Sequence, residues 1–278
     1  MIRIVTDSTC DLPQETIRKY DIRVVPLFIN IGDQGYLDGV DISREEFYRN
    51  LPAYPTQPTT AVPSIEKFRA AYEALVREGT TEILSIHISA TLSAVTDVAR
   101  VAAQEIKSIP VTVFDSRQLS LGTGFLVELA AQLAAQGKAL GEIVAALNEQ
   151  IKRSRVFAAL DTLEFLKRSG RMNGVIANFG TLLQLKPILT MFDGKAGAER
   201  VRTRERAMQR VLEMLHDAGA LERVAIVHSH APERVIELRK RAAHLLPDGD
   251  ILTMNITPVI GAHIGPGAVG FAVISKRN

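Results

Sequence analysis

Residues 82–116, EILSIHISATLSAVTDVARVAAQEIKSIPVTVFDS, carry the pattern that decides the fold. An apolar run at Glu82–Ile88 leads into a helical pattern from about Leu92 to Ile106, and a second apolar run follows at Val111–Phe114. Strands that alternate with helices of this length predict a mainly parallel sheet covered by helices on both faces. Ligands bind at the carboxyl ends of the strands in such sheets, and the hydroxyl-rich segment Ser89–Ser93 follows one of these ends.

The same alternation extends through the first half of the chain. Apolar runs at Ile2–Thr6 and Ile22–Ile31 predict further extended segments. Polar turns follow the strand ends at Asp7-Ser8-Thr9 and Asp115-Ser116. Helices are predicted at Pro13–Tyr20, Ser64–Glu78, Leu121–Ala135 and Leu140–Arg153. We therefore predict a first α/β domain with a mainly parallel sheet over residues 1–155.

The pattern changes after about Arg155. A turn signal at Asp193-Gly194 lies between two extended segments and predicts a hairpin that returns to Arg202. Fewer parallel crossovers and at least one hairpin predict a second α/β domain with a mixed sheet over residues 156–278. Its further elements are expected at Val156–Leu160, Pro187–Phe192, Arg204–His216 (helical), Val224–His228, Ile251–Ile256 and Val269–Ser275.

The composition excludes several classes of protein. The chain has 278 residues, 46% of them hydrophobic, and a formal net charge of +2. It can therefore bury a core, but it lacks the concentrated basic face that binding to nucleic acid requires. The single cysteine, Cys10, provides neither a disulfide framework nor a thiolate metal site. Since the chain lacks signal-peptide features and an apolar run of about 20 residues, we expect a cytoplasmic protein without stable membrane insertion.

Three short polar segments are candidates for forming a single ligand-binding site. Pro58–Ser64 and Ile88–Ser93 each lie where an apolar run stops and a helical pattern starts, and Gly261–Gly267 lies near the C-terminus. A helix start offers free backbone N–H groups and a partial positive charge, which suit a bound anion. Thr and Ser hydroxyls add hydrogen-bond donors without adding charge. These segments therefore predict a site for a carboxylate or a phosphate.

Eight segments follow one another in an order and at a spacing typical of a known family. They are Ile4–Leu12, Pro58–Ser64, Ile88–Ala94, Val113–Ser116, Lys167–Arg171, Leu185–Ile188, Val201–Thr203 and Gly261–Gly270. In these segments, and over essentially its whole length, the chain resembles the DegV family of bacterial fatty-acid-binding proteins.

The resemblance implies a two-domain fold with a long-chain fatty acid in a tunnel between the domains. By motif match, the carboxylate would be bound by Thr60, Ser93 and His263. The arginine of an Arg-Thr dipeptide in the family corresponds to Arg202, and we expect this residue to contact the site or a partner. The candidates for further contacts are Thr59 and Ser89. The resemblance also implies a carrier without cofactor or catalytic residues, which presents the carboxylate to a separate ATP-dependent fatty acid kinase.

The chain departs from the family pattern in two of these segments. The family often has Thr-Ser-Gln-Pro where this chain has Thr60-Ala61-Val62-Pro63. The second segment often reads Ser-Ser-Gly-Leu-Ser-Gly, whereas Ser89–Ala94 contains no glycine. The matched Thr and Ser hydroxyls are kept, so the departures bear on the shape of the pocket mouth and on the partner contact.

A fatty acid suits this set of residues chemically. Burying the tail is favourable by roughly 0.8 kcal/mol per CH₂ group, whereas a buried carboxylate needs a donor for each oxygen. The candidates for contacts with the tail, each of which also suits packing in the core, are Phe28, Ile29, Ile176, Phe179, Leu182, Leu183, Leu189 and Ile260.

The residues themselves leave alternatives open. Thr60 and Ser93 also suit helix capping, His263 a structural role, and Arg202 an exposed hairpin. Two other functions remain alternatives. One is a phosphoryl-transfer subunit for a small carbonyl substrate, because a related fold occurs in dihydroxyacetone kinase. The other is a lipid-sensing regulatory module.

Three other classes of site are disfavoured. His228 and His230 lack accompanying acidic or cysteine ligands for a metal. No Gly-x-Ser-x-Gly elbow supports a hydrolase. The glycines at 265, 267 and 270 precede the last strand rather than follow a first one, which is the wrong context for a dinucleotide site.

Overall fold

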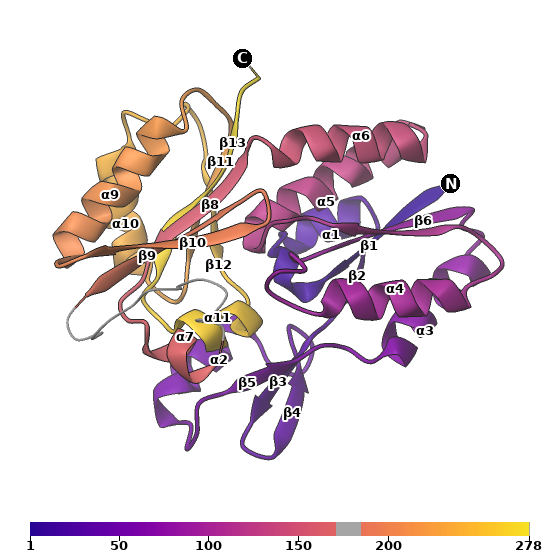
Figure 1. The fold of residues 1–278 in the computed structure, drawn as a ribbon, viewed down its shortest axis with the longest axis horizontal. Helices are drawn as coiled ribbons and strands as arrows, with labels where there is room; N and C mark the ends of the chain where they lie inside the picture. Colours follow the sequence, from indigo (N-terminus) through magenta and orange to yellow (C-terminus); the bar gives the residue numbers. More distant parts are fainter. Residues whose placement is uncertain (171–184, 278) are drawn as a thin grey trace.

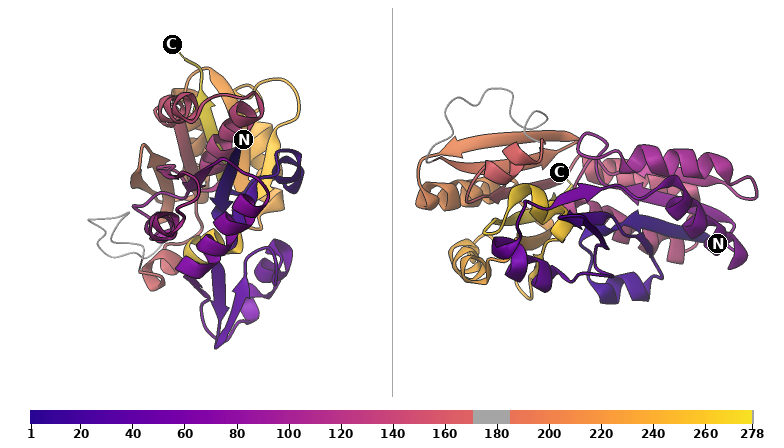
Figure 2. Two further views of the ribbon diagram at one scale, coloured as in Figure 1. Left: turned by 90° about the vertical axis from the view of Figure 1, so that its right-hand side faces the viewer. Right: turned by 90° about the horizontal axis from the view of Figure 1, so that it is seen from below.

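The computed structural model describes residues 1–170 and 185–277 (Figure 1). The strands in this part of the chain form three sheets. One has four strands in the order β2-β1-β6-β7, one has six in the order β10-β9-β8-β13-β11-β12, and one has three in the order β4-β3-β5. Figure 2 shows the three-stranded sheet projecting from the two larger ones. The predicted parallel sheet in the N-terminal part and mixed sheet in the C-terminal part are confirmed.

All strand pairs of the four-stranded sheet are parallel. Its strands are β1 (Ile2–Asp7), β2 (Arg23–Val25), β6 (Glu82–His87) and β7 (Val111–Asp115). The helices that connect and cover them are α1 (Gln14–Lys19), α3 (Ile65–Arg77), α4 (Val95–Glu105), α5 (Ser120–Ala135) and α6 (Leu140–Ile151). Helices α3 and α4 lie on one side of this sheet and α5 and α6 on the other (Figure 1). The strands are buried on both faces, which explains their nearly continuous apolar sequences.

In the six-stranded sheet β11 and β12 run parallel and the other pairs are antiparallel. The strands are β8 (Ser154–Ala159), β9 (Lys186–Phe192), β10 (Lys195–Val201), β11 (Leu221–His228), β12 (Leu252–Asn255) and β13 (Val269–Ser275). One face packs against α9 (Arg204–Asp217) and α10 (Pro232–Ala242) around Phe157, Val211 and Phe271. The opposite face contributes Val156, Ala225 and Ala272 to the core shared with the N-terminal half. The strands of this sheet begin at Ser154, and the domain division at residue 155 stays a prediction.

The third sheet consists of β3 (Phe28–Ile31), β4 (Gln34–Leu37) and β5 (Thr59–Ala61), all antiparallel. The predicted single extended segment at 22–31 is wrong in one respect, because the chain leaves the parallel sheet at Pro26 and starts β3 in another sheet. Proline has no N–H group for the strand ladder, and it therefore interrupts the pairing.

Helix α10 (Pro232–Ala242) was not predicted from the sequence, and several short helices were also missed. They are α2 (Arg44–Asn50), α7 (Glu164–Arg168), α11 (Pro258–Ile264) and the 3₁₀ turns η1 (Ser8–Cys10) and η2 (Leu51–Ala53). Helix α11 starts with proline at its first position, where the missing N–H is tolerated, and the Thr257 hydroxyl accepts a hydrogen bond from the N–H of Val259. Within the described residues, no helix is both long and apolar enough to cross a bilayer.

Candidate functional site

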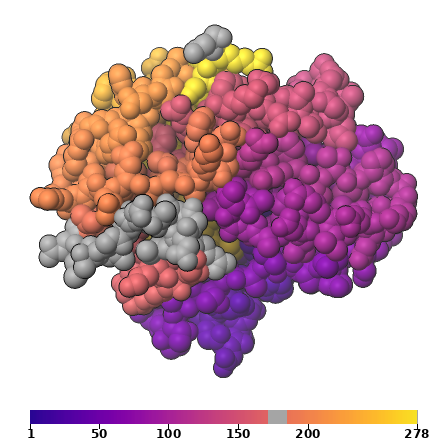
Figure 3. Space-filling model, in the orientation of Figure 1, coloured from indigo at the N-terminus to yellow at the C-terminus, as the bar shows by residue number. Residues whose placement is uncertain are grey.

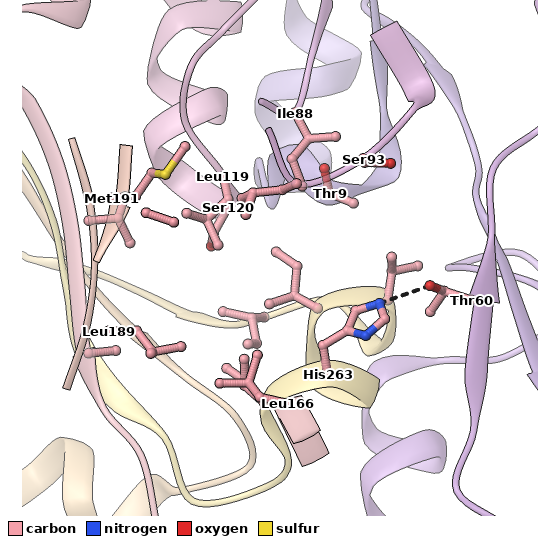
Figure 4. Close-up of a pocket in the computed structure, with 18 of the residues that line it drawn as sticks. Thr9, Thr60, Ile88, Ser93, Leu119, Ser120, Leu166, Leu189, Met191 and His263 are labelled. Carbon is pink, nitrogen blue, oxygen red and sulfur yellow. Dashed lines mark hydrogen bonds between the residues drawn. The ribbon is translucent and has the colours of Figure 1, made fainter. Parts of the chain in front are cut away.

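A cavity of about 480 Å³ lies between the six-stranded sheet and the loops at the carboxyl ends of the parallel strands (Figure 4). Ligand cavities commonly have volumes of roughly 300–1,000 Å³. Its described lining is mainly apolar and comes from both halves of the chain, with the following larger apolar residues: Leu27, Val62, Ile88, Leu92, Leu119, Val156, Leu160, Leu166, Leu189, Met191, Val227, Ile256, Val259, Ile260 and Ile264.

Three of the polar side chains in this lining lie at one end of it. Thr60 lies on β5 and His263 on α11, and the Thr60 hydroxyl is 2.9 Å from Nε2 of His263. Ser93 lines the same cavity from the loop after β6. Figure 4 shows these three residues at one end, and Leu189 and Met191 at the other. The structure therefore brings the three predicted carboxylate ligands to one cavity, and their binding role stays a prediction.

The location of Thr60 differs from the sequence expectation. It lies within a strand rather than at a helix start, and α3 begins only at Ile65. Thr60 is therefore no helix cap. His263 likewise lies in a helix and not in a glycine-rich loop. The Ser93 hydroxyl accepts a hydrogen bond from the N–H of Val95 at 3.4 Å, but the N-cap position of α4 is Ala94, and Ser93 is therefore not the helix cap either.

Backbone hydrogen bonds hold the loop that carries Ser93 from several sides. The N–H of Ser89 donates to the carbonyl of Gln118 at 2.8 Å, and the N–H of Ser93 donates to the carbonyl of Ser89 at 3.2 Å. The N–H of Ala90 donates to a carboxylate oxygen of Asp115 at 3.3 Å. The loops after β6 and β7 therefore support each other at the same edge of the sheet.

Asp7 anchors the start of this loop from the end of β1. Its carboxylate accepts hydrogen bonds from the N–H of Thr9 at 3.0 Å, from the Thr9 hydroxyl and from the N–H of Ile88 at 3.1 Å. It also lies 3.0 Å from Nδ1 of His87. Burial alone would raise the pKa of Asp7, but the hydrogen bond and charge of His87 and the other donors outweigh burial and hold the pKa below its ordinary value.

A second buried network holds α11 against the N-terminal half. Asp11 has no exposed side-chain surface and accepts hydrogen bonds from the Ser120 hydroxyl at 2.6 Å and from the N–H of Thr257 at 2.8 Å. Arg44 lies 3.0 Å from the same carboxylate. The Thr257 hydroxyl also donates to Asp38. Because Thr257 precedes α11, these contacts fix the helix that carries His263.

Burial dominates the acid–base behaviour of this network. It raises the pKa of Asp11 to about 6, although Arg44, the Ser120 hydroxyl and the Thr257 N–H act in the opposite direction. Burial also raises the pKa of Asp38, against its hydrogen bonds from Thr257 and Ser8. Arg44 acts to lower the pKa of both carboxyl groups, whereas the negative charge of Asp38 raises that of Asp11.

The cavity lining itself carries little charge. Among the described lining residues, Asp97 is the carboxylate, His228 and His263 are the imidazoles, and none is a lysine or an arginine. Within the described residues, no group of three or more metal-ligating side chains is found. The site thus combines a large apolar volume with neutral hydroxyl donors and an imidazole at one end.

The family model described as "Uncharacterised protein, DegV family" matches residues 1–276. The chain belongs to the DegV family. A DegV domain-containing protein of Streptomyces coelicolor is 35% identical over 280 residues, which cover 99% of both chains.

Two solved DegV structures are similar over 99% of both chains. One is described as fatty acid binding of a DegV family protein from Thermus thermophilus, with 36% identity and a TM-score of 0.90. The other is described as DegV, a fatty acid binding protein from Bacillus subtilis, with 30% identity and a TM-score of 0.90.

Of the other residues singled out in this DegV chain, some lie outside the described cavity lining and some belong to it. Thr59 and Arg202 are exposed, and Ser89 is fully buried with its hydroxyl 2.9 Å from that of Thr91. Leu189 and Ile260 line the cavity as predicted. Phe28 and Ile29 of β3 do not belong to the described lining, whereas Leu27, which precedes β3, does. The predicted tail contacts Ile176, Phe179, Leu182 and Leu183 lie outside the described residues.

Sequence reasoning missed three polar residues at this DegV site. Thr9 and Ser120 line the cavity, and each is held by one of the buried aspartates. Gln57 connects three elements, because its amide donates to the carbonyls of Phe165 at 3.2 Å and Ala262 at 3.1 Å. Contacts between residues far apart in the chain leave no local sequence pattern. Of the three residues, Thr9 lies in a turn that the sequence indicated, Asp7-Ser8-Thr9.

Proposed function

We propose that this protein binds a long-chain fatty acid and presents its carboxylate to a fatty acid kinase. The observation that carries the proposal is the cavity of about 480 Å³, apolar over most of its described lining, with Thr60, Ser93 and His263 at one end. Two similar DegV proteins are described as fatty-acid-binding.

The polar end has the donors that a carboxylate needs. The hydroxyls of Thr60 and Ser93 and the His263 imidazole donate hydrogen bonds to the two oxygens in this proposal. Hydrogen bonds to a charged group contribute about 1.5–3 kcal/mol each. A carboxylate bound by neutral donors keeps its charge, and it remains available as a nucleophile toward a phosphoryl donor.

The two ends of the cavity differ in burial. Thr60, Ser93 and His263 are partly exposed, and the exposed residues Ala94 and Asp97 line the cavity beside Ser93. Met191 at the opposite end is buried. This difference supports a bound orientation with the carboxylate near the surface, where a partner kinase can reach it. Since such a kinase consumes ATP, the proposed role belongs to the cytoplasm.

The same lining argues against the phosphoryl-transfer alternative. A small phosphorylated or polyhydroxylated substrate requires charged and polar groups around its whole perimeter, and cations in particular. The described lining has no lysine or arginine. In our proposal the protein is therefore a carrier and co-substrate, and the catalytic groups belong to the kinase.

Native mass spectrometry of the purified protein tests the binding step. We expect a co-purified acyl chain, released by denaturation and identified as a free fatty acid. A protein that carries no lipid, and that does not bind added palmitate or oleate in calorimetry, would contradict the proposal.

A reconstituted assay tests the presentation step and separates the carrier from a lipid sensor. With a fatty acid kinase and ATP, the loaded protein is expected to give acyl phosphate. The double variant Thr60→Ala, Ser93→Ala should lose that product while its circular dichroism and unfolding temperature stay close to the wild type. Binding without any acyl phosphate would instead favour the sensor.

A further inference from the structure

Three side chains from neighbouring strands form one row across the six-stranded sheet. Val156 on β8 pairs with Met191 on β9, and Met191 pairs with Ala196 on β10. All three line the cavity. The adjacent row toward α11 contains Ala158 and Leu189, which also line it. Two residues along a strand span about 7 Å, so these rows mark successive depths along the cavity.

The cavity ends just beyond the row of Val156. The next side chain of β8 on this face is Ser154, whose carbonyl accepts a hydrogen bond from the amide of Gln118 at 3.0 Å. Both residues are buried, at 1% and 0% exposure, and neither belongs to the described lining. The loop before α5 therefore lies directly on the sheet at this point and leaves no room for a ligand.

The turn of the β9–β10 hairpin closes the same end. The N–H of Gly194 donates to the carbonyl of Arg117 at 3.0 Å, and the Arg117 guanidinium lies 3.0 Å from Asp193. The Thr91 hydroxyl donates to the carbonyl of Gly194 at 3.1 Å. On the face in Figure 3, orange atoms of the C-terminal half meet magenta atoms of the N-terminal half in a continuous surface.

In the row of Val156, Met191 and Ala196, Met191 has the side chain that can change its conformation most easily. Val156 is held by α5, which approaches so closely that a Cβ at Gly122 would lie 2.7 Å from Cγ2 of Val156. Ala196 has a single methyl group. Met191 is 1% exposed, and it has the long unbranched side chain that adapts to irregular space. Figure 4 shows it at the end opposite Thr60 and His263.

We infer that Met191 forms the end wall against which the terminal methyl of the acyl chain stops, so that it sets the longest chain this protein accepts. The inference rests on the proposed function. With the carboxylate fixed at one end, each further methylene has to be accommodated at the other end. Shortening residue 191 opens space there, whereas enlarging residue 196 removes it.

The experiment measures dissociation constants for saturated fatty acids from C12 to C22 by competition with a fluorescent fatty acid. Met191→Ala removes three heavy atoms beyond Cβ, which makes room for about two methylenes. We expect the optimum to move two carbons longer, with that chain gaining about fifteenfold in relative affinity. Ala196→Leu should move the optimum to shorter chains. Met191→Leu, which conserves volume, should leave the optimum in place.

A matched control separates the end wall from general loosening of the core. Met208 is 2% exposed and packs on the opposite side of the six-stranded sheet. Met208→Ala creates a similar loss of packing away from the cavity, and it should leave the chain-length optimum unchanged. If Met191→Ala fails to fold, Ala196→Leu decides the question.

The outcomes distinguish this inference from the proposed function. A wild-type protein that binds no fatty acid overturns both. A wild-type protein that binds fatty acids, together with an optimum that neither Met191→Ala nor Ala196→Leu shifts, overturns the end wall alone. A shift of equal size in Met208→Ala also overturns it.

Discussion

The Thr60 hydroxyl lies 2.9 Å from Nε2 of His263, although 203 positions separate the two residues in the chain. Thr60 belongs to the three-stranded sheet and His263 to the short helix α11. Gln57, two residues before β5, donates to the carbonyl of Ala262 close to this pair, so β5 and the segment that leads into it are joined to α11 at two points. The polar end of the cavity therefore exists only when both segments are in place.

Replacing Thr60 by valine tests its role as a donor. The change keeps the β-branched shape and removes the hydroxyl, so we expect fatty acid affinity to fall by about tenfold or more, equivalent to about 1.5–3 kcal/mol. The corresponding fatty alcohol has no carboxylate and should lose much less. Thr60→Ser keeps the hydroxyl and is the matched control. Equal losses for acid and alcohol would assign Thr60 to packing alone.

Asp7→Asn is expected to destabilise the fold strongly. The carboxylate accepts hydrogen bonds from the backbone of Thr9 and Ile88 and lies against His87, and the side chains of Asp7 and His87 have no exposed surface. The side-chain NH₂ group of the new asparagine can only donate, so it faces other buried donors without an acceptor between them. Breaking a buried pair in this way costs about 3–5 kcal/mol. Urea unfolding measures the loss. Tyr72→Phe, which removes a single hydrogen bond to Ser85 at 2.9 Å, should cost about 1 kcal/mol. Similar values for the two variants would contradict this assignment.

Asp11 makes the stability of the fold pH-dependent. Its pKa is about 6 in the folded protein against an ordinary value of 3.8, so the folded state binds the proton more tightly than the unfolded chain does. The contribution of Asp11 to the free energy of unfolding therefore stabilises the folded state fully below about pH 4. This contribution is lost as the pH rises through about 6. Between about pH 4.5 and 7 the loss amounts to about 2 kcal/mol.

Asp11→Asn removes this titration and isolates the contribution. Urea unfolding at several pH values should show the wild type losing stability relative to the variant as the pH rises. Asp38, whose pKa is also raised, acts in the same direction in both proteins, whereas Asp7, whose pKa is lowered, acts below about pH 4. Parallel pH profiles for wild type and variant would show that Asp11 titrates normally.

Gly267→Ala is expected to strain the turn that follows α11. Gly267 has a φ of +87°, and a Cβ there would lie 2.3 Å from a carboxylate oxygen of Asp161. Gly137 has a φ of +76° and open space around it, so Gly137→Ala measures the backbone strain alone, about 1 kcal/mol. Thermal unfolding should therefore show a clearly larger loss for Gly267→Ala. Equal losses would mean that the turn shifts away from Asp161 without strain.

Much of the fold could be predicted from local patterns. The alternation around residues 82–116 predicted β6, α4 and β7 within a few residues, because strand and helix periodicities differ clearly in apolar sequences. The hairpin at Asp193-Gly194 was predicted from its turn residues. The small antiparallel sheet and α11 were missed, because their segments are short and tertiary contacts stabilise them.

The sequence by itself determined the elements of the two larger sheets and, through motif match, the residues to examine as carboxylate ligands. Only the tertiary structure decided which side chains meet. Thr60, expected at a helix start, lies in a strand and faces His263, and Met191 lies at the far end of the cavity. Periodicity assigns a residue to a face of its own element, because it depends on neighbours three or four positions away. Which faces enclose a common space depends on how distant elements pack, and that information is distributed over the whole chain.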